Sequence, residues 1–246
     1  MKFSPLFTEL FNTLINLIYP PFCLFCEVPL PSNAQLMLCS TCLSLVKIVT
    51  EPLCLCCGHP FTKYGGASHL CGTCLSSPPF FDQARALFLY EDPIKTIIHK
   101  FKYNDQAAGL KIAPYSMAQC NHLSGLINPD IIIPVPVHKN RLRKRGFNQS
   151  VRLAQIFYPT SIHKINTTTL IRAVDSAPQT SLSGMARRTN LKNAFLIRNG
   201  DELSAKKIVL VDDVFTTGTT VNECAKLLKK NGAAEVKVLT LARVKD

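Results

Sequence analysis

The stretch that decides the fold is Ile208-Val-Leu-Val-Asp-Asp-Val-Phe-Thr-Thr-Gly-Thr-Thr220. The apolar residues at its start predict a buried strand of a parallel sheet over Lys207–Val211, and Asp212 and Asp213 follow directly. The small residues after them predict a loop and then a helix over Thr219–Lys230. Because ligands of α/β proteins bind at the carboxyl ends of parallel strands, we expect a ligand at this loop.

The chemistry of the loop suits a ribose 5-phosphate. Backbone N–H groups at the helix start would surround the phosphate, and Gly218 permits a positive φ and a close approach. The carboxylates of Asp212 and Asp213 would accept hydrogen bonds from two neighbouring ribose hydroxyls. The alternative is a solvated aspartate pair before a capped helix. Four loop hydroxyls would add donors to the phosphate: Thr216, Thr217, Thr219 and Thr220.

Outward from this stretch, strands and helices alternate along the chain. The apolar patterns predict strands over Ala84–Tyr90, Asp130–Val137 and Glu235–Arg243. Helices are predicted over Pro93–Tyr103, Ala107–Cys120 and Asn148–Phe157. This alternation predicts an α/β fold, with a parallel sheet flanked by helices.

Composition changes near residue 80. The chain has 28 basic and 16 acidic residues, a formal net charge of +12, but residues 1–82 hold only three of the bases and four of the acids. Nine of the eleven cysteines lie between Cys23 and Cys74. We therefore predict two domains, an N-terminal helix with a cysteine-rich head over residues 1–80 and a basic α/β body over residues 81–246. The positive charge excludes an ordinary acidic enzyme and favours anionic partners such as phosphates or nucleic acid.

The cysteines of the head include four Cys-x-x-Cys pairs. Twelve residues separate the first two pairs and thirteen separate the last two, a spacing at which two pairs hold one tetrahedral Zn²⁺. We predict two structural zinc ions, because four thiolates per ion leave no open position for catalytic water. The simplest ligand sets are Cys23, Cys26, Cys39 and Cys42 for one ion and Cys54, Cys57, Cys71 and Cys74 for the other.

Two alternatives to these zinc sites are an interleaved pairing of the four pairs and a disulfide framework. No secretory signal precedes the cysteines, which favours metal over disulfides. Cys120 and Cys224 lie outside the head and are predicted to be small core residues. Residues 1–18 are predicted to form a short amphipathic helix packed on the protein, with a reversible membrane contact as the alternative. No stretch reaches the ~18 uninterrupted apolar residues of a membrane span, and we expect a cytoplasmic protein.

The stretch 208–220 resembles the signature with which type I phosphoribosyltransferases bind 5-phosphoribosyl-1-pyrophosphate (PRPP). A second stretch, Pro134 to Gln149 (PVPVHKNRLRKRGFNQ), is similar to the loop after the first core strand of the ComF family. These are competence-associated proteins with a phosphoribosyltransferase-like fold, many with an N-terminal double zinc ribbon. Residues 71–103 are similar as well, and so are five later positions: Gln179, Leu182, Arg187, Asn190 and Phe195. The chain is identified as a member of this family, and the expected body is a type I phosphoribosyltransferase-like parallel sheet flanked by helices.

The resemblance implies Mg²⁺-dependent transfer of the phosphoribosyl group of PRPP to an acceptor, with pyrophosphate as the leaving group. Asp212 and Asp213 would be catalytic and would lie behind Mg²⁺, which the oxygens of PRPP itself would largely hold. Arg143 and Arg145 would be catalytic by stabilising the charge on pyrophosphate. Arg141 and Lys144 would also bind PRPP, and Gly146 would allow its close approach.

The basic segment 139–145 has two alternatives, a solvated charge run and a contact for nucleic-acid phosphates. Lys139, in this segment, and Arg152, beyond it, are the basic residues that we assign to solvent. Purine phosphoribosyltransferases carry an aspartate directly before the Thr-Gly of the signature, where this chain has Thr216. A hydroxyl cannot act as a general base near neutral pH, so the acceptor need not be a purine. His138, beside the basic segment, is the histidine that we would test.

Two classes of function follow from these observations. In the first, the protein is a phosphoribosyltransferase. In the second, it is a non-catalytic factor that responds to PRPP or a related nucleotide and binds single-stranded DNA. The resemblance implies that the second role belongs to natural transformation and DNA uptake, with other DNA-uptake proteins as partners. Since few aromatic residues accompany the bases, we expect weak DNA binding with little sequence preference.

Overall fold

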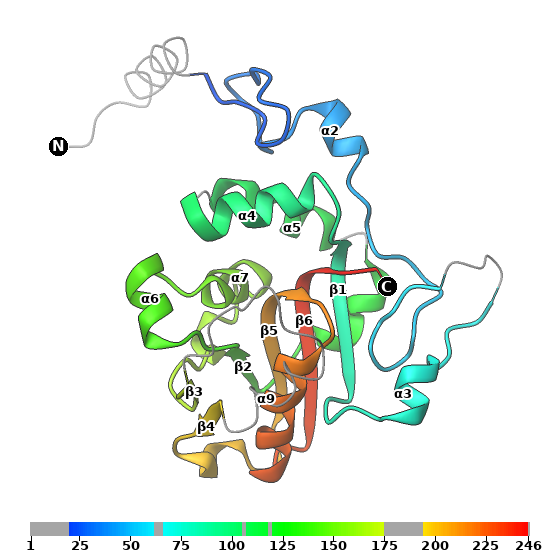
Figure 1. Cartoon of the computed structure of the whole chain (residues 1–246), viewed down its shortest axis with the longest axis vertical. Coiled ribbons are helices and arrows are strands. Elements are labelled where there is room, and N and C mark those ends of the chain that lie inside the picture. The colour runs from blue at the N-terminus through cyan, green and yellow to red at the C-terminus, as the bar shows by residue number, and fades with distance from the viewer. Residues whose placement is uncertain (1–19, 62–65, 105–106, 118–119, 175–193, 246) are drawn as a thin grey trace. The chain divides into compact units, whose positions relative to one another are not determined.

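The computed structural model describes residues 20–61, 66–104, 107–117, 120–174 and 194–245 (Figure 1). The predicted helix over residues 1–18 and four of the family positions, Gln179, Leu182, Arg187 and Asn190, lie outside the described residues. The chain divides into two compact units, Met1–Lys47 with Glu91–Ile112 and Ile48–Tyr90 with Ala113–Asp246. The domain boundary between residues 80 and 81 stays a prediction.

The first unit combines the first half of the cysteine-rich head with a later helix. Its elements are α2 (Ser40–Ser44), α4 (Ile94–Asn104) and the 3₁₀ turn η1 (Ala107–Lys111). Gly109 lies so close to Leu24 that a β-carbon on it would come within 2.6 Å of the leucine Cδ1. One face of α4 is at most 1% exposed, as expected for an amphipathic helix, at Ile94, Ile97, Ile98 and Phe101.

The second unit is built on a four-stranded parallel sheet. Its strands lie in the order β1 (Gln83–Leu89), β6 (Glu235–Arg243), β5 (Lys207–Phe215) and β2 (Ile131–Pro134). The register pairs Pro134 with Val211 in β2 and β5. It pairs Phe215 with Arg243 in β5 and β6. The carboxyl ends of three strands therefore meet at one edge of the sheet, which confirms the predicted fold class.

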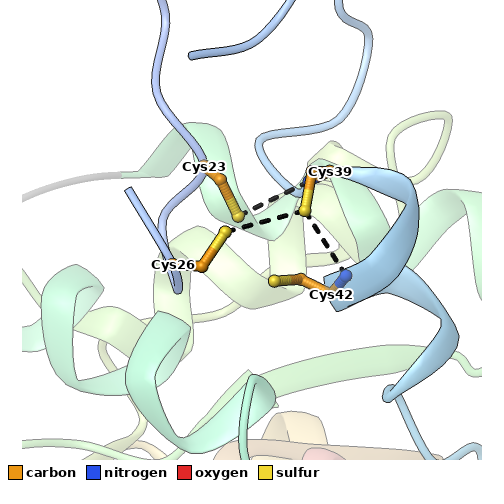
Figure 2. A group of neighbouring side chains, drawn as sticks. All are labelled: Cys23, Cys26, Cys39 and Cys42. Carbon is orange, nitrogen blue, oxygen red and sulfur yellow. Dashed lines mark hydrogen bonds between the residues drawn. The ribbon is translucent and has the colours of Figure 1, made fainter. Parts of the chain in front are cut away.

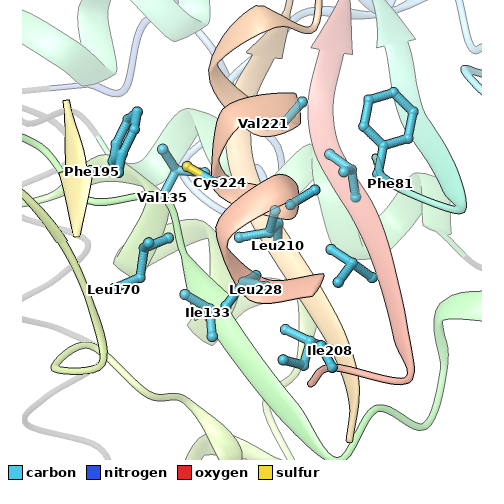
Figure 3. Packing of buried hydrophobic residues seen from close by; sticks show 14 of the residues in the cluster. Phe81, Ile133, Val135, Leu170, Phe195, Ile208, Leu210, Val221, Cys224 and Leu228 are labelled. Carbon is cyan, nitrogen blue, oxygen red and sulfur yellow. The ribbon is translucent and has the colours of Figure 1, made fainter. Parts of the chain in front are cut away.

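Helix α9 (Thr219–Lys230) covers one face of this sheet, and the main core lies between them (Figures 1 and 3). β5 contributes Ile208 and Leu210 to the core, and α9 contributes Val221, Cys224 and Leu228, each at most 3% exposed. Burying an aliphatic side chain of this size stabilises the fold by about 1.5–3 kcal/mol. The predicted helix over Thr219–Lys230 and the predicted core position of Cys224 are both confirmed.

The remaining elements are short. The helices are α3 (Gly72–Ser76), α5 (Ile112–Met117), α6 (Lys139–Arg145) and α7 (Gln149–Phe157). The 3₁₀ turns are η2 (Asn121–Leu126), η3 (Ile162–Lys164) and η4 (Gly200–Leu203). A separate antiparallel pair consists of β3 (Leu170–Arg172) and β4 (Phe195–Ile197). Among the described residues, no helix is both long and apolar enough to span a bilayer.

The structure differs from the sequence-based expectation in several places, and β2 is shorter than the strand predicted over Asp130–Val137. β5 continues to Phe215, so Asp212 and Asp213 lie within the strand and not after it. The helix predicted over Ala107–Cys120 begins as the 3₁₀ turn η1 and continues as the shorter α5. Glycine and proline interrupt this segment at positions 109 and 114, and both residues disfavour a continuous α-helix. The basic segment after β2, expected as a loop, is the helix α6.

Candidate functional site

The loop between β5 and α9 has the backbone that a phosphate requires. Gly218 is the N-cap of α9 and has a φ of +72°. A β-carbon at this position would come within 2.5 Å of Cζ of Phe215, so both the backbone angle and the available space require glycine. The hydroxyl oxygens of Thr217 and Thr219 lie 2.8 Å apart. Because α9 begins at Thr219, the N–H groups of its first turn have no partner within the helix and are available to an anion.

The two predicted carboxylates lie at the end of β5 in different environments. Asp212 is half-buried, and its Oδ1 accepts hydrogen bonds from the Ser150 hydroxyl at 3.1 Å and from the Asp213 N–H at 2.9 Å. Asp213 is only 6% exposed. Ser150 lies in the first turn of α7, where its N–H donates to the N-cap side chain of Asn148 at 2.9 Å. Asn148 also donates to the carbonyl of Val135, so Asp212 is linked to the segment that follows β2.

The basic segment after β2 forms α6 because both of its ends are capped. His138 is the N-cap, and its Nδ1 accepts from the N–H of Asn140 at 3.3 Å. Gly146 ends the helix in the left-handed region, at a φ of +82°. Arg143 and Lys144 are exposed, whereas Arg141 and Arg145 are half-buried, and Arg145 donates to the side-chain oxygen of Gln149. His138 is only 6% exposed.

A pocket of about 770 Å³ adjoins the phosphate loop within the second unit. One wall consists of Phe215 and residues 216–219, and Arg243 lies beside them. Three residues of the second cysteine cluster, Cys57, Cys71 and Cys74, also line this pocket. The sequence placed these cysteines and the phosphate loop in separate domains, so only the structure shows that they share a pocket.

A second hollow, a groove of about 620 Å³, lies beside α6, α7 and β3. Its lining includes Pro136, Leu142, Val151 and other apolar residues. Four basic side chains also line the groove: Lys139, Arg152, Arg172 and Arg198. Lys139 and Arg152 are exposed, as the sequence predicted, but they belong to this basic groove and are not isolated surface charges.

The eight cysteines of the four Cys-x-x-Cys pairs form two clusters, and the pairing is sequential, not interleaved. Within each cluster all four sulfurs lie within 4.8 Å of one another, and Figure 2 shows the first cluster converging on a common centre. Cys26 and Cys39 Sγ are 3.7 Å apart, and so are Cys57 and Cys71 Sγ. A tetrahedral site with Zn–S near ~2.3 Å needs sulfurs about 3.8 Å apart, so both clusters fit zinc. All eleven cysteines lie among the described residues and none forms a disulfide.

Backbone N–H groups prepare one sulfur of each cluster for metal. Burial raises the pKa of the Cys54 thiol, but hydrogen bonds from backbone N–H groups nearby outweigh it and lower that pKa to about 6. One of these donors is the N–H of Cys71, 3.3 Å from the sulfur. The same balance lowers the pKa of Cys23 to about 6. The thiolate is the form that binds metal, so hydrogen bonds that stabilise the thiolates of Cys23 and Cys54 also favour metal binding.

Three residues of the site are not predicted by the sequence analysis: Ser150, Phe215 and Arg243. Phe215 lies within the quoted stretch, but its role depends on the position of its ring under Gly218. Arg243 ends the last strand, and only the register of β5 and β6 shows that it lies beside Phe215. The signal for Ser150 is its place two residues after a helix-capping asparagine, where a side chain of the first turn can point at the sheet edge.

Comparison with known proteins matches both halves of the chain to families. Residues 14–75 match the model of the double zinc ribbon domain, and residues 102–246 match the phosphoribosyl transferase domain. The solved structure of a purine phosphoribosyltransferase from Pyrococcus horikoshii Ot3 is similar at 24% identity and a TM-score of 0.31. The alignment covers 55% of this chain and 72% of the other chain. That score is too low for the alignment to add to the family assignment.

Curated relatives align over most of the chain. DNA utilization protein YhgH of Escherichia coli O157:H7 is 36% identical over 92% of this chain and 99% of its own. Competence protein F of Haemophilus influenzae is 37% identical over 84% of this chain and 90% of the relative's length. Competence protein ComFC of Bacillus subtilis is 27% identical over 83% of each chain. With a double zinc ribbon followed by a phosphoribosyl transferase domain, the chain belongs to the ComF family.

Proposed function

We propose that this protein binds PRPP with Mg²⁺ at the loop between β5 and α9 and transfers its phosphoribosyl group to an acceptor, in a process of DNA uptake or utilisation. The observation that carries the proposal is the Gly218 turn. It has a positive φ, it packs against the Phe215 ring, and it follows a strand that bears two carboxylates. The biological setting comes from the names of the relatives, competence protein F and DNA utilization protein YhgH.

In this proposal the loop holds the 5-phosphate and the carboxylates hold the ribose. The phosphate lies at the N-terminus of α9, where the helix dipole and the free N–H groups favour an anion. The ribose hydroxyls donate to Asp212 and Asp213. The carboxylate oxygens are hard donors of the kind that Mg²⁺ prefers, so Asp212 and Asp213 fit a supporting role behind the ion. When bound with PRPP, Mg²⁺ would supply positive charge beside the pyrophosphate group, and Asp212 and Asp213 are the residues that would support the ion.

In this proposal the cations of α6 attract the leaving pyrophosphate. β2 pairs with β5 up to Val211, one residue before Asp212, so α6 and the phosphate loop follow strands that end at the same edge of the sheet. Arg141, Arg143, Lys144 and Arg145 all belong to α6, and Gly146 ends it. Their positive charge would stabilise the developing negative charge of the leaving group. The proposal does not require a purine acceptor, because residue 216 is threonine and not a carboxylate.

The alternative function is a non-catalytic one, in which PRPP or a nucleotide is a ligand and single-stranded DNA is the partner. The observation that favours it is the groove beside α6 and α7, where Lys139, Arg152, Arg172 and Arg198 accompany apolar residues. Such a groove suits a phosphate backbone, and binding would be weak because phosphate neutralisation and not base recognition supplies the free energy.

One assay distinguishes the two functions. Pyrophosphate release is measured with PRPP and Mg²⁺ in the presence of a panel of nucleobases, amines and oligonucleotides. Release that requires one acceptor, and that is absent in Asp213→Ala, supports transfer. Calorimetric binding of PRPP without release under any condition supports the ligand-responsive alternative. Absence of both binding and release contradicts the proposal.

A further inference from the structure

We propose that Arg243 and the second cysteine cluster position the phosphate loop, so that ligand binding at the loop depends on zinc in the second ribbon and not on zinc in the first. The inference rests on the proposed function for the identity of the ligand, a phosphoribosyl compound. It assigns Arg243 as a positioning residue, because the contacts described below reach the loop through Phe215.

The first step links the second ribbon to Arg243. Arg243 ends β6 and is only 3% exposed. Its Nη1 donates to the carbonyl oxygen of Cys57 at 2.7 Å, and its Nη2 lies 3.5 Å from Nδ1 of His59. A buried guanidinium that donates to a carbonyl is a strong, directional contact, so the position of Arg243 depends on the turn that carries Cys57.

The second step links Arg243 to Phe215. The guanidinium carbon lies 5.3 Å from the centroid of the Phe215 ring, in the geometry of a cation–π contact. The strand register places the two residues side by side, and the N–H of Val244 donates to the carbonyl of Phe215 at 3.0 Å. The ring also packs edge-on against Phe81, with centroids 6.0 Å apart. Two side chains, Arg243 and Phe81, therefore contact the Phe215 ring.

The third step links Phe215 to the phosphate loop. The ring lies where a β-carbon at residue 218 would stand, so any shift of the ring changes the space below the Gly218 turn. Cys57, Arg243, Phe215 and residues 216–219 also line the same pocket of about 770 Å³. The path from the metal ligand Cys57 to the backbone of the loop thus runs through two side chains.

Zinc would hold the first part of this path in place. The turn of the second ribbon is closed by the N–H of Gly58, which donates to the carbonyl of Cys54 at 2.9 Å, and by the N–H of Cys54, which donates to the carbonyl of His59 at 2.8 Å. Both ends of the turn carry ligands of the second cluster, Cys54 and Cys57. Without metal, four thiols would no longer share a centre, and the Cys57 carbonyl would lose its fixed position toward Arg243.

Arg85 supplies a matched control for Arg243. It is a buried arginine of β1, 7% exposed, and it donates to the carbonyls of Cys54 and Leu55 in the same turn. None of its described contacts reaches Phe215 or the phosphate loop. Replacing either arginine by lysine keeps the charge but removes the planar group that can donate and stack at the same time. If the ribbon merely stabilises the fold, the two substitutions should have similar effects.

The experiment compares calorimetric binding of PRPP with Mg²⁺, zinc content and the ¹H–¹⁵N resonance of the Gly218 amide. We expect Arg243→Lys to weaken binding about tenfold, the range of a desolvated cation–π contact, and to shift the amide while both zinc ions stay bound. Arg85→Lys should leave affinity and the amide unchanged. Phe215→Leu, which keeps the Arg243 contact with Cys57, should reproduce the loss if Arg243→Lys proves poorly folded.

The metal arm of the experiment uses one cysteine from each cluster. Cys57→Ser should lose one zinc equivalent together with PRPP affinity, whereas Cys26→Ser should lose one equivalent and keep the affinity. Wild-type affinity and an unshifted Gly218 amide in both Arg243→Lys and Phe215→Leu would overturn the inference. If the wild type itself does not bind PRPP, the proposed function fails, and the Gly218 amide in the same variants still decides whether Arg243 positions the loop.

Discussion

The ring of Phe215 occupies the space that a β-carbon on Gly218 would need, with Cζ only 2.5 Å from that position. Gly218 also has a φ of +72°, so two independent constraints exclude a side chain there. We predict that Gly218→Ala destabilises the protein by at least about 1–2 kcal/mol through the left-handed backbone alone and abolishes PRPP binding. Urea unfolding and calorimetry measure the two effects.

Gly232, just beyond the other end of α9, is the control for this prediction. It has a φ of +88°, but a β-carbon there would meet Ser204 no closer than 3.4 Å. Gly232→Ala should therefore show the backbone cost without the loss of binding. Equal PRPP affinity in the two variants would contradict a phosphate site at Gly218.

Zinc content is the second prediction. Eight thiols in two clusters, each with its four sulfurs within 4.8 Å of one another, should bind two equivalents of zinc per chain, measured by elemental analysis of protein purified without chelator. Cys26→Ser should reduce the content to one equivalent, because the two clusters share no ligand. A content near zero, with disulfides found by mass spectrometry, would show that the thiols are not metal ligands.

The third prediction concerns pH. Burial lowers the pKa of His122 below its ordinary value, against the opposing effect of the Ala86 carbonyl, 3.2 Å from Nε2. The unfolded chain then binds more protons than the folded one near pH 6, so His122 makes the free energy of unfolding fall as the pH drops below about 6.5. His122→Gln should reduce the dependence of the free energy of unfolding on pH. Urea titrations at about pH 7 and about pH 5, on either side of the ordinary histidine pKa of about 6.5, measure this dependence.

His163, in η3, is an exposed histidine and provides the control. His163→Gln should leave the pH dependence of stability as it is in the wild type. A wild-type slope that His122→Gln does not change would assign the acid sensitivity to other groups.

DNA binding is the fourth prediction. The basic helix α6 should contribute to weak, sequence-independent binding of single strands, in the micromolar range of non-specific complexes. Replacing Arg141, Arg143 and Arg145 by alanine should lower both the DNA affinity and its salt slope, by about one unit of slope for each phosphate that is no longer neutralised. Fluorescence anisotropy at several salt concentrations measures both quantities, and PRPP with Mg²⁺ should weaken binding if the same cations serve both ligands.

A control variant with the same loss of charge tests whether position matters. Lys206, Lys226 and Lys230 are exposed bases outside α6. Their replacement by alanine should reduce DNA affinity less than the α6 variant does. If the α6 variant binds DNA as the wild type does, the DNA surface lies elsewhere, and the cysteine-rich head becomes the next candidate.

Much of the fold follows from local pattern. The stretch 208–220 and the helix after it have strong, unbroken signals, so the strand begins at Lys207 and the helix begins at Thr219 as the sequence predicts, although the strand continues past Val211 to Phe215. β3 and β4 are not predicted, because strands of three residues carry no readable period. α6 is not predicted as a helix either, because its caps, His138 and Gly146, are recognised only once the backbone is known.

The residues of the candidate site, like the elements of the fold, can be predicted only in part from the sequence. Gly218 and Asp212 can be predicted because a phosphate loop and a strand-ending carboxylate have sequence signatures of their own. Arg243 cannot, because its role arises from pairing with a strand far back in the sequence, and pairing is a property of the folded sheet. The shared pocket of the second ribbon and the loop likewise depends on packing that neither motif encodes.

The most direct test is calorimetric titration of the wild-type protein with PRPP in the presence and absence of Mg²⁺, repeated with Asp213→Ala. We predict saturable binding of one PRPP per chain that requires Mg²⁺ and is lost in Asp213→Ala, while the thermal unfolding of the two proteins confirms that both are folded. Absence of binding by the wild type, or equal affinity in the folded variant, would contradict a phosphoribosyl site at the end of β5.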